Sequence, residues 1–137
     1  MVGQGIPAPT ADRVGFPTNY EATFTKMLTI DRADNGQIRV IWANEVAART
    51  PWWESYPYGS VLLFESWTSK RDENNNLLLD ENGRLNTNGL TTLFVKRKEV
   101  GFGEAYQQNR NGEWEYVAYR TDGTVQTAPQ NTGKWAV

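Results

Sequence analysis

The chain has 137 residues, of which 39% are hydrophobic and 22% charged, so one domain with a real core fits and no apolar run reaches the ~18 residues of a membrane span. It contains neither Cys nor His, which excludes disulfides, thiolate nucleophiles, Ser-His-Asp triads, structural zinc sites and histidine-ligated haem within these residues. Its 14 basic and 16 acidic residues give a net charge of −2, which carries no electrostatic signature of nucleic-acid or anionic-membrane binding.

The sequence of the N-terminal part indicates a flexible arm followed by a helix. Glycines and prolines interrupt residues 1–16, which we expect to form a flexible arm without a regular element. A helix of about 14 residues begins near residue 17, where Thr18 or Asn19 can cap it. Apolar side chains then recur at helical spacing and form one core-facing stripe: Tyr20, Phe24 and Met27 or Leu28.

The remainder alternates as strands do. The turn residues Asn35-Gly36 predict a hairpin. We expect a short helical turn at residues 43–49, ended by Pro51, and a long polar connection at residues 70–89. The expected strands are 28–31, 37–42, 60–69, 90–99 and 113–120. The prediction is therefore an α+β fold in one domain, residues 17–137, with an antiparallel sheet of about five strands, an N-terminal helix and one short helix.

The strands are apolar on both faces. Period-two alternation places Leu62 and Phe64 on one face, and Val61 and Leu63 on the other. One helix covers one face only, so the second face needs loops, a large ligand or another copy of the chain. We expect a homodimer with an interface of at least ~1,000 Å².

The candidate binding residues are mainly aromatic. We expect an apolar small-molecule pocket on one sheet face, with two lid residues from the helix. Its candidates are Leu62, Phe64, Phe94, Trp114 and Tyr116, with Phe24 and Met27 as the lid. The adjacent loop residues Trp52 and Trp53 are candidates for an interface or for stacking on a carbohydrate.

No catalytic or metal-binding constellation emerges. Six glutamates could supply a carboxylate pair for glycoside hydrolysis, but nothing in the sequence brings two of them together: Glu45, Glu54, Glu65, Glu104, Glu113 and Glu115. Residues 72–83 begin like a calcium loop, but Leu77 stands where the obligatory glycine belongs and the closing glutamate is missing. A solvated turn is the better interpretation, and no metal site is expected.

A series of short motifs follows a recognisable order along the chain. They are Phe16-Pro17-x-x-Tyr20, Thr29-x-Asp31-Arg32, Arg39-x-Ile41-Trp42-Ala43-Asn44, Gly59-Ser60-Val61-Leu62-Leu63-Phe64-Glu65, Leu79-Asp80-Glu81-Asn82-Gly83-Arg84, Phe94-Val95-x-x-Lys98, and Gly112-Glu113-Trp114-Glu115-Tyr116 with Asp122-Gly123. From about residue 16 to the end, this order resembles the cytochrome P-460 family, which includes the cytochromes c′-beta.

The resemblance implies an exported bacterial haem protein, usually a homodimer, built on an antiparallel sheet with few helices. In that family the haem is attached through a C-terminal Cys-x-x-Cys-His whose histidine is the proximal ligand. P-460 members also cross-link a strand lysine to the porphyrin and oxidise hydroxylamine, whereas c′-beta members lack the cross-link and bind small gases.

The sequence departs from this pattern at two positions. Trp135 stands where the first cysteine of the haem motif is expected, and Phe64 stands where the cross-linking lysine is expected, which is nearer to the c′-beta type. The first hypothesis is a haem-free relative that binds a small molecule in an apolar pocket, with no cofactor in this chain. The alternatives are a c-type haem protein, hydroxylamine-oxidising or gas-binding, whose haem motif is missing from this chain, and a carbohydrate-binding module.

Whether the chain is an enzyme stays open, because an oxidoreductase is implied only where the haem is present. By resemblance we expect a periplasmic or secreted bacterial protein, although the first residues show neither the basic nor the apolar region of a signal peptide.

Overall fold

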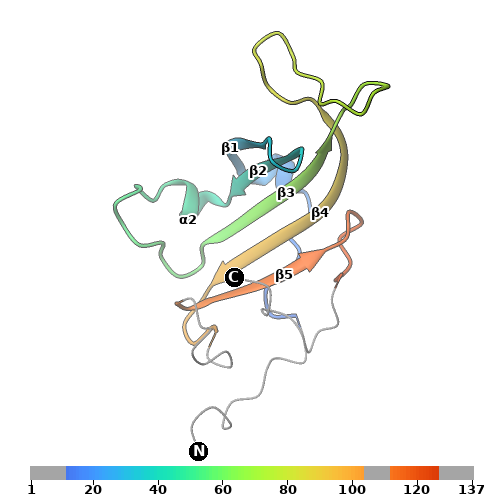
Figure 1. Ribbon diagram of the computed structural model, residues 1–137. Coiled ribbons are helices and arrows are strands. Elements are labelled where there is room, and N and C mark those ends of the chain that lie inside the picture. Colours follow the sequence, from blue (N-terminus) through green and yellow to red (C-terminus); the bar gives the residue numbers. More distant parts are fainter. Residues whose placement is uncertain (1–11, 104–111, 127–137) are drawn as a thin grey trace, which may run out of the picture.

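The fold is a five-stranded antiparallel meander. The computed structural model describes residues 12–103 and 112–126. The strands follow one another in the order β1-β2-β3-β4-β5, and every neighbouring pair is antiparallel (Figure 1). Their bounds are Thr25–Arg32 for β1, Gln37–Ala43 for β2, Val61–Ser69 for β3, Thr87–Lys98 for β4 and Trp114–Tyr119 for β5. The sheet expected from the alternation is confirmed.

Helices are a minor part of the described residues. Two are present there, α1, Tyr20–Thr23, and α2, Glu45–Ala48, with four residues each. The expected N-terminal helix of about 14 residues is wrong, because Phe24 is already extended (φ −95°, ψ 162°) and β1 begins at Thr25. Its residues pair with β2, and this pairing overrides the helical spacing of the apolar side chains. The described fold is therefore mostly β rather than α+β.

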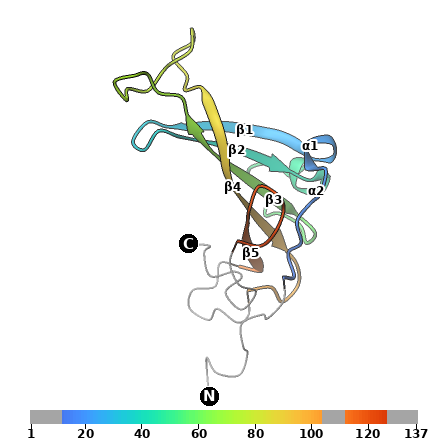
Figure 2. The ribbon, with the colours of Figure 1, turned by 90° about the vertical axis from the view of Figure 1, so that its right-hand side faces the viewer.

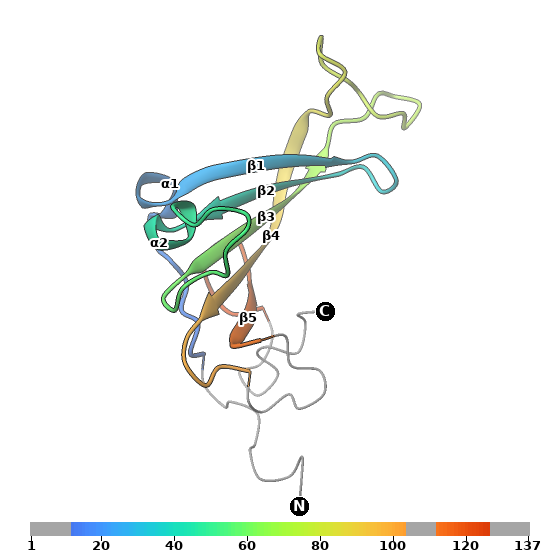
Figure 3. The same ribbon diagram turned by 90° about the vertical axis from the view of Figure 1, so that its left-hand side faces the viewer.

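The two faces of the sheet are defined by its register. Leu63 pairs with Val95, which pairs with Val117, and we call the side that they share face A. Leu62 pairs with Lys96, which pairs with Tyr116, on the opposite side, face B. The strands twist progressively from β1 at one edge to β5 at the other, as Figures 2 and 3 show.

Face A is covered at one end by the segment before β1. Val14, in the segment expected to be a flexible arm, is only 2% exposed and packs with Leu63, Val95 and Val117. Tyr119 donates a hydrogen bond from its hydroxyl to Asp12. Val14 is therefore part of the core and Phe16 packs against it, so this end of the expected arm is held on the sheet; residues 1–11 lie outside the described residues.

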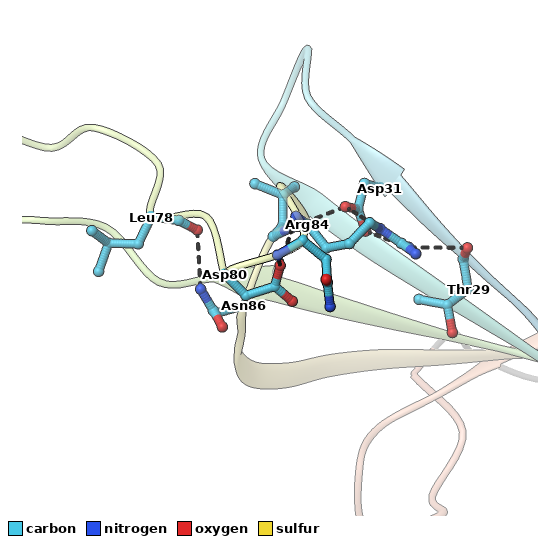
Figure 4. A network of polar contacts seen from close by, with 8 residues as sticks. Thr29, Asp31, Leu78, Asp80, Arg84 and Asn86 are labelled. Atoms are coloured by element: carbon cyan, nitrogen blue, oxygen red, sulfur yellow. Dashed lines mark hydrogen bonds and ion pairs between the residues drawn. The ribbon is translucent and has the colours of Figure 1, made fainter.

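The connection between β3 and β4 covers the other end of face A. Leu85 packs with the buried Ile38 and Val40 of β2. Arg84 holds this connection on β1 with two hydrogen bonds to Asp31, from Nε to Oδ2 at 2.9 Å and from Nη2 to Oδ1 at 3.1 Å (Figure 4). These bonds lower the pKa of Asp31.

The turn that began like a calcium loop is closed by its own side chain. Asp72 Oδ1 accepts hydrogen bonds from the backbone N–H groups of Asn74 at 2.8 Å and Asn76 at 2.9 Å. These N–H groups lower the pKa of Asp72, and the carboxylate fixes an Asx turn. Across residues 12–103 and 112–126, no group of three or more acidic residues could hold a metal ion.

Candidate functional site

An aromatic enclosure on face B surrounds a single lysine. The Nζ atom of Lys96 lies 4.5 Å from the ring centroid of Trp114, 5.8 Å from that of Tyr116 and 5.9 Å from that of Phe64. Three strands build the enclosure, because Lys96 stands on β4 between Leu62 of β3 and Tyr116 of β5. We call Lys96 and these three aromatic residues the Lys96 site.

Aromatic rings surround the lysine amine, and no counter-ion accompanies it among the described residues. Within residues 12–103 and 112–126, Lys96 Nζ forms no ion pair or hydrogen bond. Its partial burial lowers the pKa of the amine, because the charged form loses solvation. The negative faces of the surrounding rings compensate in part. The site thus offers a positively charged group that is short of an anion.

The base of the site is firmly packed. Leu62 and Ala43, which are 6% and 1% exposed, form a cluster with Ala47 of α2, and Trp114 packs against it. The ring of Tyr56 meets that of Trp114 edge to face at 5.8 Å. Helix α2 is fixed in turn by its cap, Asn44, whose Oδ1 accepts the N–H of Ala47 at 3.1 Å. The aromatic wall therefore rests on a buried base.

Five of the residues expected to line a pocket lie on this face. Phe64, Trp114 and Tyr116 surround the lysine, Leu62 forms the base, and Phe94 pairs with Phe64 on the same face. The two lid residues do not join them.

The helix expected to carry the lid residues does not form, because β1 begins at Thr25. Phe24 packs against the face-A core instead. Met27 lies in β1 with 48% of its surface exposed. Trp52 and Trp53 lie in the loop after α2 and are 91% and 68% exposed. Trp135 lies outside the described residues.

Sequence reasoning missed the central residue. The alternation around Phe94 places Lys96 on the same face as the aromatic candidates, and this was the available signal. Alternation alone does not assign a role to such a lysine, because long side chains often extend to solvent from inward positions.

One protein-family model matches most of the chain. The sequence model of the family described as Cytochrome P460 matches residues 17–134, a span that includes the whole Lys96 site. No curated protein matches the chain. Among the described residues, no helix is long and apolar enough to cross a membrane.

Proposed function

The chain belongs to the cytochrome P460 family, and from this premise we propose that the Lys96 site binds a small molecule without a covalently attached haem. The observation that carries this proposal is the enclosure of Lys96 by three aromatic rings with no anion beside it among the described residues. A ligand with a flat apolar body and one anionic group would meet both needs, because it contacts the rings and pairs with the amine.

The residues present do not fit the haem attachment that the family resemblance implies. Covalent attachment through Cys-x-x-Cys-His needs two cysteines and a histidine, and these 137 residues contain neither amino acid. Phe64, at the position expected for a cross-linking lysine, supplies only a ring to the Lys96 site. We therefore derive no step through a haem from this chain.

Benzoate and its neutral analogue benzyl alcohol test the proposed ligand class. We expect calorimetry to show benzoate binding, weakened about tenfold or more by Lys96→Met and largely retained in Lys96→Arg. Lys70→Met is the matched control, because Lys70 is an exposed lysine remote from the rings. Equal affinity for benzoate and benzyl alcohol, or an unchanged Lys96→Met variant, would contradict the proposal.

The c-type haem protein remains the alternative from a different class, with its haem motif outside these residues. An absorption spectrum of the protein purified from its natural source separates the two. We expect no Soret band; a Soret band with the spectrum of thioether-bound haem would replace the haem-free proposal.

A carbohydrate-binding role is the second candidate, and the exposure of two neighbouring tryptophans favours it. The rings of Trp52 and Trp53 meet at 90° with centroids 5.6 Å apart, so one ring can offer its face to a sugar while the other supports it from the edge. Quenching of tryptophan fluorescence by oligosaccharides, lost in Trp52→Ala, would support this role.

We further propose a homodimer that is exported to the periplasm or secreted. The chain covers face A with its own segments, whereas Leu28 and Ile30 of β1, on face B, are 53% and 37% exposed. An apolar edge of this kind suits a twofold contact between two copies. Sedimentation at micromolar concentration tests the assembly, and a species of 15.6 kDa alone would contradict it.

A further inference from the structure

A pocket lies on the side of the sheet opposite to the Lys96 site. It has a volume of about 240 Å³ and opens on face A between the segment around α1 and strands β3 and β4. Its lining includes Phe16, Tyr20, Glu21, Glu65, Trp67 and Leu93. At about 30 Å³ per water molecule, this space corresponds to about eight waters, which suits a ligand the size of a small aryl amine.

The floor of the pocket holds a buried carboxylate. Glu65 is 5% exposed. Its Oε2 accepts a hydrogen bond from the hydroxyl of Tyr20, and its Oε1 accepts one from Nε1 of Trp67 at 3.0 Å. Burial, and then the bond to Glu65, raises the pKa of Tyr20, so the phenol stays protonated as a donor. Both partners are neutral.

Glu65 differs in this respect from the other acidic residues of the sheet. The five strands contain three carboxylates, all on face A, and arginines pair with two of them: Arg84 with Asp31, and Arg13 with Glu115. Among the described residues Glu65 has no Lys or Arg partner. A carboxylate offers about four acceptor positions, and two are in use. A buried polar group is costly unless its hydrogen-bonding positions are filled, and Glu65 lines the pocket, where a donor group can reach its free positions.

We propose that this pocket binds a small organic cation, an ammonium compound with an apolar or aromatic body. The ammonium N–H groups bond to Glu65, while the rings of Phe16, Tyr20 and Trp67 supply walls of the kind that enclose organic cations. Glu21 adds negative charge to the lining. This site is independent of the Lys96 site, because Glu65 and Phe64 point to opposite faces of β3.

Calorimetry with benzylammonium, and with benzyl alcohol as its neutral counterpart, tests the charge requirement. We expect benzylammonium to bind the intact chain at least about tenfold more tightly than benzyl alcohol. Glu65→Gln should remove this preference, whereas Glu73→Gln, which changes an exposed glutamate in the β3–β4 connection, should keep it. Equal binding of the two probes, or an unchanged Glu65→Gln variant, would overturn the proposal.

A measurement on the unmodified chain covers the case in which Glu65→Gln fails to fold. The indole N–H of Trp67 bonds to Glu65, so its NMR signal should shift with benzylammonium and hardly at all with benzyl alcohol. The same shift with both probes, or none with either, would assign Glu65 a structural role only, as the acceptor that ties Tyr20 to the sheet, and would reject the cation site.

Discussion

The apolar side chains on the two faces of the sheet are covered in different ways. Face A carries all three strand carboxylates and is covered by residues 12–24 and by the β3–β4 connection. Face B carries no strand carboxylate, and its bases include Arg39, Lys96 and Lys98. Alternation along the strands thus places the three strand carboxylates on face A, where arginines pair with two of them, and places Lys96 on face B among aromatic rings.

The sharpest test of the difference between the faces compares two neighbours on β3. Leu63 faces A and is 0% exposed, whereas Phe64 faces B and is half-buried. Leu63→Ala should lower the free energy of unfolding by about 3 kcal/mol, because it leaves a cavity in a closed core. Phe64→Ala should cost less, although it removes more atoms. Urea denaturation measures both, and an equal or larger loss for Phe64→Ala would show that face B is closed as well.

Much of this two-sided arrangement could be read from the sequence. Alternation placed Leu62 and Phe64 opposite Val61 and Leu63, and the Asn35-Gly36 turn fixed the β1–β2 hairpin, where Gly36 adopts a φ of 69°. The sequence also placed the aromatic residues of the Lys96 site on one face, because period two needs no tertiary information.

The segments that cover face A could not be predicted from the alternation of residues along the sequence. Val14 lies among residues that suggest a loose arm, and it is held in the core where its neighbours Asp12 and Arg13 bond to Tyr119 and Glu115, more than a hundred residues away. Likewise, the stripe from Tyr20 to Leu28 suits a helix locally, and pairing with β2 decides otherwise. Long-range contacts of this kind leave no local periodic signal.

A second test removes one ion pair that holds the cover on face A. Asp31 has its pKa lowered by Arg84, so its contribution to stability is present above the unfolded pKa of about 4 and is lost as the pH falls through the lower folded pKa. Asp31→Asn should therefore reduce stability at pH 7, by at most about 1 kcal/mol because the pair is open to solvent.

The stability that the charge of Asp31 contributes can be followed with pH. We measure the urea midpoints of Asp31→Asn and of the unmodified chain between pH 7 and pH 2. The difference between the two proteins should narrow toward the acid end. A difference that stays constant with pH would mean that the contribution of Asp31 does not depend on its charge.

The smallest expected effect on stability concerns Lys96 on face B. Here removal of the charge should raise stability at pH 7, whereas removal of the charge of Asp31 should lower it. Folding lowers the pKa of Lys96, so the unfolded chain binds the proton more tightly, and the cost of burying the ammonium is complete below the folded pKa. This cost is relieved as the pH rises from the folded pKa toward the unfolded value of about 10.4.

The Lys96→Met variant removes the charge. We expect this variant to be slightly more stable than the unmodified chain at pH 7, with the difference in stability closing toward pH 10. The raised pKa values of Tyr20 and Tyr119 affect both proteins equally, so the difference between their thermal midpoints isolates Lys96. A variant that is less stable at pH 7 would show that the contacts of the lysine with the rings outweigh its lost solvation, and the amine would then need no anion from a ligand.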